Sequence, residues 1–353
     1  MITRKRGGKI AVNQEAYQNQ SAADIEARYR TLSLRLGGVM LVFFVAFTVF
    51  SVLVGIVIPL LTDLMPHPYG VVVYELLYGV LYALCFAAPA FCFYLFARRD
   101  KDYQPLDLSF SLPRHVPLYI FVAIAVVSAA GYVNSYLLDL ISFDILPDLV
   151  SVGTGATTNV ELVLMVFTMA IVPGFIEELL FRGVILKNML PFGRTTAVVA
   201  SAFLFGVMHQ NPAQFFYTTV AGLVLGYIYV HTRSLWCTVI IHMCNNFLAV
   251  VYTVLGERLS PEIHPVVVLW IELFVFVLGG ACAVYLILRT RRTGAEVKRD
   301  GAFGHALATD AEYTDLPLPL SRRVKLFFSA PMIIFLVLAA LEMAALLLLN
   351  MVL

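Results

Sequence analysis

The sequence predicts an all-α fold, a polytopic transmembrane helical bundle of about eight or nine spans. The first observation is composition, because 60% of the 353 residues are hydrophobic and only 13% are charged, a balance too apolar for soluble domains. The second is a series of apolar runs near the roughly 20 residues that a helix needs to cross a hydrocarbon core of about 30 Å. The third is the sorting of positive charge into alternate loops. Together they indicate a chain whose surroundings are the lipid bilayer.

The apolar runs define the spans in chain order. Six are clear and cover residues 37–61, 71–96, 118–141, 235–255, 266–288 and 332–353. Between residues 160 and 229 proline and glycine interrupt the apolar sequence, and such residues mark helix boundaries. We therefore expect three shorter helices there, over residues 160–188, 195–209 and 213–229.

These spans divide the chain into segments. They are a cytoplasmic N-terminal segment (1–36), three N-terminal spans (37–141), a motif-bearing core (160–255), a further span (266–288), a cytoplasmic linker (289–331) and a C-terminal span (332–353). The linker mixes charged residues and glycine with Pro317 and Pro319, and we predict that it is mobile. The first apolar run is long enough to span and no small-residue cleavage site follows it, so we interpret it as a retained span.

Charge sorting predicts the orientation of the chain. With the N-terminus in the cytoplasm, the internal segments contain nearly all Lys and Arg residues, whereas the external loops contain only Arg258 beside acids such as Asp63, Asp144, Asp148 and Glu262. This is the positive-inside pattern.

The formal net charge of +1 gives the chain no strong positive potential that would attract a nucleic-acid partner. The five cysteines all fall in apolar runs, so we interpret them as core residues rather than a disulfide or zinc framework.

Ionisable residues within the spans are the places where chemistry is expected. Each one costs at least about 2.5 kcal/mol at the bilayer centre and so needs a partner, a water cavity or a function. The candidates are Glu75, Glu161, Glu177, Glu178, Arg182, His209, His242, Glu272 and Glu342. Glu75, Glu272 and Glu342 are isolated on spans without motifs, and we predict packing or boundary roles for them. Five of the others fall in neighbouring central helices.

The first cluster is Glu177-Glu178 followed by Arg182. Adjacent helical residues point about 100° apart, so the two carboxylates cannot share one task, whereas Glu178 and Arg182 at i and i+4 can pair. Glu177 is then free to face another helix. The alternative is a helix-end salt bridge at the cytoplasmic boundary, with Glu177 extending to the membrane surface.

Two further polar positions follow. His209 closes an apolar helix, and His242 and Asn246 stand at i and i+4 on one face while Asn245 is expected to point elsewhere. A tight turn at residues 191–194 places Glu177 and His209 level, about 20 Å from the inner end, with His242 somewhat shallower. The alternative for these residues is interhelical hydrogen bonding that only holds helices together.

The three motifs E-E-x-x-x-R, F-x-x-x-H and H-x-x-x-N, in this order between residues 160 and 255, resemble those of the CPBP family. That family groups type II CAAX prenyl endopeptidases with bacteriocin-processing and immunity-type membrane proteases of bacteria. The resemblance implies an intramembrane endopeptidase of a bacterial cell membrane, acting on a membrane-associated peptide or protein, lipidated or not. It also implies roles: Glu177 activates a water beside His209, His242 and Asn246 bind or stabilise the oxyanion, and Glu178 and Arg182 support that geometry.

Elementary chemistry agrees with these roles. A buried carboxylate can serve as a general base, and donors that converge on one oxygen form an oxyanion hole. Glu177, His209 and His242 could also hold a zinc ion with an open position, although the spacing is not the H-E-x-x-H signature. We favour metal-free chemistry and keep zinc as the alternative cofactor.

Two other classes of function fit part of the pattern. A proton-coupled transporter would use the same Glu and His residues as a relay, and it predicts a polar path across both halves of the bilayer. A catalytically silent membrane scaffold or immunity protein would bind a peptide without cleaving it.

Overall fold

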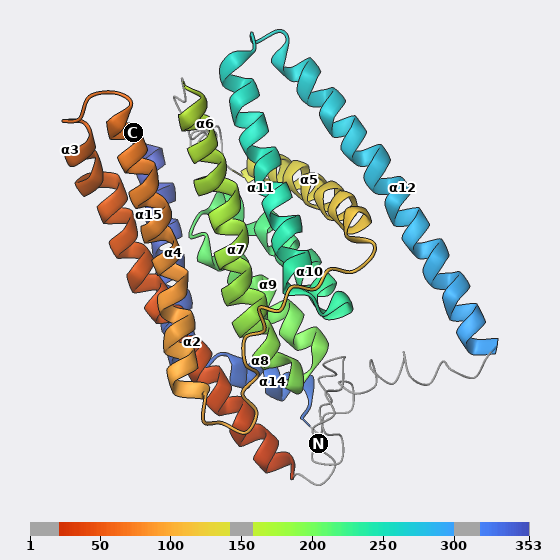
Figure 1. The fold of residues 1–353 in the computed structure, drawn as a ribbon. Coiled ribbons are helices and arrows are strands. Elements are labelled where there is room, and N and C mark those ends of the chain that lie inside the picture. The colour runs from red at the N-terminus through yellow and green to blue at the C-terminus, as the bar shows by residue number, and fades with distance from the viewer. Residues whose placement is uncertain (1–20, 142–157, 300–317, 353) are drawn as a thin grey trace, which may run out of the picture.

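The computed structural model describes residues 21–141, 158–299 and 318–352, and the regular structure in these ranges is helical throughout. In chain order the elements are α2 (Ala22–Val52), η1 (Leu53–Val57), α3 (Ile58–Thr62), α4 (Tyr69–Ala97), α5 (Val116–Ile141), α6 (Asn159–Val166), η3 (Phe167–Ile171), α7 (Val172–Glu178), η4 (Leu179–Leu186), α8 (Lys187–Met189), η5 (Leu190–Phe192), α9 (Arg194–Met208), α10 (Pro212–Thr232), α11 (Leu235–Arg258), α12 (His264–Arg299), α14 (Leu320–Phe327) and α15 (Ala330–Val352). Figure 1 shows α3, α6 and the C-terminus at one end of the bundle and α8, α14 and the start of α2 at the other. The predicted all-α bundle is confirmed.

The spans agree with the apolar runs. Within the described ranges, 8 helical segments are long and apolar enough to cross a membrane: Ala22–Thr62, Tyr69–Ala97, Val116–Leu140, Asn159–Phe192, Pro212–Thr232, Leu235–Arg258, His264–Arg289 and Ala330–Leu348. The ninth predicted span is α9, which has 15 residues. At about 1.5 Å per residue it is shorter than the roughly 30 Å core. It packs against α10 instead, so its end at His209 lies inside the bundle.

The fourth span is one helix with two wider turns. Here α6 continues through the π-helical η3 into α7 and then into the π-helical η4. Pro173 at the start of α7 has no N–H to donate, and local widening of the helix accommodates a missing bond. Such π turns are frequent at functional sites. Here they flank α7, which ends with Glu177 and Glu178.

The remaining spans enclose this central region. The last helix, α15, packs against the first, α2, which also packs against α4, while α12 packs against α5. Figure 1 shows α2, α4 and α15 on one side of α7 and α5 and α12 on the other. The motif-bearing helices therefore lie between helices from both ends of the chain.

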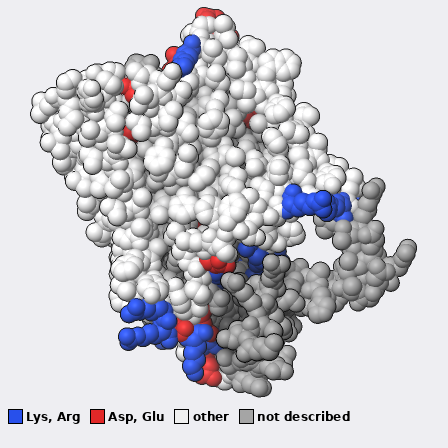
Figure 2. All heavy atoms as spheres, viewed as in Figure 1, with Lys and Arg blue, Asp and Glu red and all other residues white. Residues whose placement is uncertain are grey.

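The surface is that of a protein embedded in lipid. Figure 2 shows charged residues mostly gathered toward the ends of the molecule, with a wide uncharged belt between them. Large apolar side chains are exposed in the spans, among them Val45, Phe91, Leu269 and Val337. Apolar side chains facing outward along whole helices are expected where the solvent is hydrocarbon. The chain is an integral multi-pass membrane protein, as its composition predicted.

The predicted linker contains more helix than its composition indicated. Helix α12 continues to Arg299, and α14 forms before the last span. In α14, Arg322 pairs with Glu26 of α2, and Arg323 donates to the carbonyl of Phe192 at 2.9 Å. Contacts with two distant helices therefore stabilise this short amphipathic segment.

Several sequence predictions concern residues outside the described ranges. They are the basic residues before position 21, the external acids Asp144 and Asp148, and the centre of the linker with Pro317. The cytoplasmic placement of the N-terminus also stays a prediction.

Candidate active site

The three motifs meet at one cavity. Glu177 at the end of α7, His209 at the end of α9, and His242 and Asn246 on α11 all line a cavity of about 150 Å³. Side chains from α5 and α10 complete its wall. A space of this size holds several water molecules, each of which occupies about 30 Å³ in the liquid. The structure thus brings the four predicted site residues together.

Glu177 divides its two oxygens between different surroundings. Its Oε1 accepts a hydrogen bond from the Tyr82 hydroxyl at 2.6 Å. Its Oε2 is buried, has no hydrogen-bond partner among the described residues, and lies 3.9 Å from Nε2 of His242. That separation exceeds a direct hydrogen bond. One oxygen is therefore held by the protein, and the other remains available to a molecule in the cavity.

His242 is oriented by Glu178. Its Nδ1 lies 3.0 Å from Glu178 Oε1, and because a carboxylate only accepts, Nδ1 donates. Its Nε2 then faces Glu177. The same Glu178 oxygen accepts from Arg182 at 2.5 Å. The sequence predicted the pair of Glu178 and Arg182 and expected Glu178 to turn away from the site. Glu178 does not line the cavity, but it contacts a residue that does.

Arg182 connects three helices. Its guanidinium is fully buried, and Nη2 donates to the carbonyl of Gly222 on α10 at 3.2 Å. It also lies over the ring of Phe205 on α9, 4.6 Å from the centroid, a favourable cation–π contact. The rings of His209 and His242 pack edge-on against Phe205, at centroid distances of 5.1 and 5.7 Å. Phe205 is thus a shared packing surface for the site, a role that the F-x-x-x-H motif alone did not reveal.

The turn that carries His209 is attached to the C-terminal helix. His209 Nδ1 donates to the carbonyl of Phe205 at 2.8 Å. The next residue, Gln210, is buried with a left-handed φ of 51°. Its side-chain amide, assigned so that the nitrogen faces Glu342 on α15, donates to the two carboxylate oxygens at 2.7 and 3.1 Å. Asn211 then caps α10. Glu342, for which a packing or boundary role was predicted, connects α15 to this turn.

The prediction that Asn245 points elsewhere is wrong. Asn245 lines the cavity together with Asn246, and its Nδ2 donates to Asn246 Oδ1 at 3.4 Å. Adjacent helical positions point about 100° apart, and the cavity extends far enough along the side of α11 to include both. The site therefore contains two amide side chains.

A close contact of α7 with α11 sets the geometry between Glu177 and His242. A Cβ atom on Gly174 would lie 2.6 Å from Cγ of Met243 and 2.9 Å from its backbone nitrogen. Only glycine permits this approach without displacement of one helix. Gly174 is one turn before Glu177, and Met243 directly follows His242, so the contact holds these two site residues in register.

The other ionisable residues have local partners. Glu75 accepts from Thr168 at 2.6 Å, and Glu272 accepts from Tyr252 at 2.6 Å. Glu161 forms a capping box at the start of α6 and pairs with His67 at 2.8 Å. These contacts are packing and boundary roles of the kind that we expected for Glu75 and Glu272.

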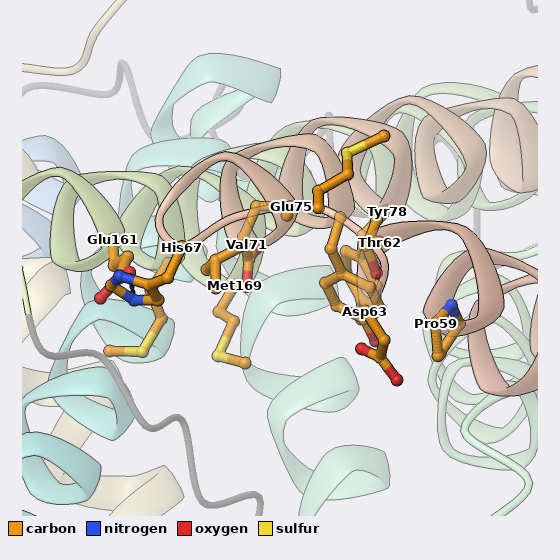
Figure 3. Close-up of a pocket in the computed structure, with 13 residues that line it drawn as sticks. Pro59, Thr62, Asp63, His67, Val71, Glu75, Tyr78, Glu161 and Met169 are labelled. Atoms are coloured by element: carbon orange, nitrogen blue, oxygen red, sulfur yellow. Dashed lines mark ion pairs between the residues drawn. The ribbon is translucent and has the colours of Figure 1, made fainter.

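A second cavity, of about 590 Å³, lies outside the motifs between α3, α4 and α6. Figure 3 shows Glu75, Glu161, His67 and Tyr78 around it. None of the predicted catalytic residues lines it. Although it is the larger space, the chemistry described above is at the smaller one.

The predicted zinc ligands do not form a preorganised set. Among the residues that the structure describes, no group of at least three His, Cys, Asp or Glu side chains stands where it could hold a metal ion. One nitrogen of His242 is engaged by Glu178 and one of His209 by a backbone carbonyl. Both contacts use Nδ1 and leave Nε2 of each ring available as a donor or a ligand, so they are compatible with either chemistry.

The fold and site define a class of protein: a multi-pass helical membrane protein with a carboxylate, two imidazoles and two amides around a cavity between its spans. Residues 159–248 match the family model of type II CAAX prenyl endopeptidase Rce1-like proteins. The match confirms the resemblance predicted from the three motifs, and it supports membership of this part of the chain in the CPBP/CAAX intramembrane protease family. Comparisons with curated proteins and with solved structures found no match.

The buried ion pair generates a stability prediction. Arg182→Ala should lower the free energy of unfolding by about 3 to 5 kcal/mol, because it leaves the Glu178 carboxylate buried without its cation. Thermal unfolding of the purified protein in detergent measures the effect. Arg322→Ala, which removes an arginine from a surface ion pair, is the control and should change the melting temperature little. An unchanged melting temperature for Arg182→Ala would contradict the structural role.

The α7 and α11 contact generates a second prediction. Gly174→Ala should destabilise the protein by about 1 to 3 kcal/mol, as overpacking does, because the new methyl group overlaps Met243. Gly131→Ala in α5 is a matched control, since a Cβ there meets no atom of the described residues within 4 Å. Unfolding midpoints of the two variants are compared with that of the wild type. If both variants unfold at the wild-type midpoint, the close contact between α7 and α11 does not contribute to stability.

Proposed function

We propose that the protein is an intramembrane endopeptidase that hydrolyses a peptide bond in a membrane-associated peptide or protein, with a water molecule activated by Glu177. The observation that carries this proposal is the Oε2 atom of Glu177, which is buried without a hydrogen-bond partner among the described residues, at a cavity that His242 and His209 also line. The family match supports protease chemistry at this position, because it covers all three motifs.

The proposed reaction uses the different surroundings of the two carboxylate oxygens of Glu177. Water binds between Oε2 and the substrate carbonyl, Glu177 takes one proton, and the hydroxide oxygen attacks the carbonyl carbon. A tetrahedral intermediate with a negatively charged oxygen results. Glu177 then gives the proton to the leaving nitrogen as the C–N bond breaks. The products are one carboxylic acid and one amine, so the atoms of one water molecule are accounted for.

The oxyanion is stabilised from α11. Asn246 and Asn245 offer amide N–H groups, and His242 presents Nε2 on the same side. With Nδ1 bonded to Glu178, a protonated His242 has its charge stabilised by a carboxylate, and its Nε2–H then donates to the oxyanion. His209 lies beside the water. Glu178 and Arg182 hold this set in place without contact with the substrate.

The surroundings of the site argue against a transport pathway. A relay needs polar groups through both halves of the bilayer, but the residues that follow Arg182 toward α8 are apolar. Val184, Ile185 and Leu186 are all buried in the core. The chain between Arg182 and α8 therefore contributes packed hydrocarbon and no relay group. We further propose a bacterial cell membrane as the location, with the N-terminus in the cytoplasm.

The central test is Glu177→Gln. The amide keeps the shape of the carboxylate but cannot take a proton at neutral pH, so cleavage of membrane peptides by the purified variant should be abolished while the melting temperature stays near that of the wild type. Glu75→Gln is the matched control, because Glu75 is a carboxylate in the spans that also accepts one hydroxyl hydrogen bond, and it should cleave normally. Wild-type activity in Glu177→Gln removes the central residue of the proposal.

The same assay decides between the two chemistries. Metal-free hydrolysis should continue after treatment with a chelator and dialysis. A zinc enzyme would lose its activity and recover it only when the metal is returned. A silent scaffold would cleave nothing in either condition and would bind substrate equally well with Glu177→Gln.

The amide donors generate a separate prediction. Asn246→Ala should lower kcat by about 10²- to 10³-fold, the usual loss for one oxyanion donor, and should leave measurable cleavage because Glu177 is intact. Asn245→Ala tests the neighbouring amide in the same assay. If Asn246→Ala cleaves at the wild-type rate, the oxyanion is not bound at this face of α11.

A further inference from the structure

Tyr82 contacts the proposed base from outside the family domain. It belongs to α4, whereas the family match covers only residues 159–248. Its hydroxyl lies 2.6 Å from Oε1 of Glu177. An ionised carboxylate only accepts, so the phenol donates. No motif in the sequence includes this residue, and 95 positions separate it from its partner.

The ring of Tyr82 is held on several sides. It stacks on Tyr78 of the same helix at 5.9 Å with an interplanar angle of 8°. Phe86, one turn later, lies 5.0 Å away, and Phe50 of α2 meets it edge-on at 5.6 Å. Aromatic neighbours at these distances restrict the ring. The hydroxyl is therefore directed at Glu177 before any substrate arrives.

We propose that Tyr82 is a positioning residue that assigns different tasks to the two oxygens of Glu177. This inference rests on the proposed function. The hydrogen bond occupies Oε1 and fixes the rotation of the carboxylate, so that Oε2 is the atom that takes the water proton. A carboxylate that rotates freely would have to be oriented in each catalytic cycle, and such ordering costs rate. The N-terminal spans thereby complete a site whose motifs all lie in the central helices.

A simpler role for Tyr82 is that of an interhelical hydrogen bond that only stabilises the bundle. The two roles differ in what they change. A purely structural bond affects the melting temperature or the fraction of folded protein and leaves the turnover of each folded molecule intact. A positioning bond affects kcat, with KM and the melting temperature close to those of the wild type.

The test compares Tyr82→Phe with Tyr78→Phe. Both variants keep the aromatic ring and lose one hydroxyl from the same stack, but within the described residues only the hydroxyl of Tyr82 is bonded to Glu177. Tyr78 lines the second cavity instead (Figure 3). We expect Tyr82→Phe to lower kcat by about 10- to 100-fold, the loss that corresponds to one hydrogen bond to a charged group. The pH dependence of kcat should change in this variant and not in Tyr78→Phe.

Two outcomes would overturn the inference. One is a wild-type kcat in Tyr82→Phe. The other is a loss of activity fully explained by a loss of folded protein. If the wild type cleaves no peptide, that result counts against the proposed function alone. The contact between Tyr82 and Glu177 can then be tested without substrate. Difference infrared spectra of wild type and Glu177→Gln identify the bands of the Glu177 carboxyl group, which should shift in Tyr82→Phe and not in Tyr78→Phe. Bands that stay in place in both variants would refute the hydrogen bond.

Discussion

A fully buried guanidinium is the constraint on which the site depends. Arg182 is 0% exposed, and transfer of such a charge out of water costs several kcal/mol unless the charge is paired and hydrogen-bonded. Glu178, the carbonyl of Gly222 and the face of Phe205 supply that compensation. These partners come from the helix of Arg182 itself, from α10 and from α9. Pairing of this cation therefore holds the helix of the first motif against α9 and α10.

The same network determines the orientation of the imidazole. Because Glu178 also accepts from His242, α11 is attached to the ion pair, and Nε2 of His242 is turned toward Glu177. The two adjacent glutamates thus lie in different surroundings. Glu178 is engaged with a cation and an imidazole away from the cavity, whereas Glu177 keeps one oxygen in it. Their separation of about 100° around the helix makes this division possible.

The site is also supported by helices without motifs. Tyr82 of α4 contacts Glu177 from one side, and Glu342 of α15 holds the turn next to His209 from another. Both partners were recognised only in the structure. In the sequence Tyr82 is one of 17 tyrosines, and Glu342 is an isolated acid on an apolar span. Neither has a neighbour in the sequence that distinguishes it from packing material.

Some predictions failed because they considered local sequence, whereas the outcome depends on contacts between distant parts of the chain. Helical periodicity placed Asn245 away from the site because it considers one helix at a time, whereas a cavity bounded by several helices can include two adjacent positions of α11. The segment predicted as a linker contains α14, whose contacts with Glu26 and Phe192 are long-range. Local composition carries no information about such contacts.

The sequence by itself determined the membrane class, the long spans and the resemblance to a protease family. The first two depend on a local quantity, the apolar length that a bilayer requires, and the third depends on three short motifs that can be read in the chain. Only the tertiary structure decided which oxygen of Glu177 is free, what orients His242, and which residues outside the motifs complete the site. These features depend on distances between side chains that are far apart in the chain. Such distances follow from the packing of whole helices, and no local pattern records them.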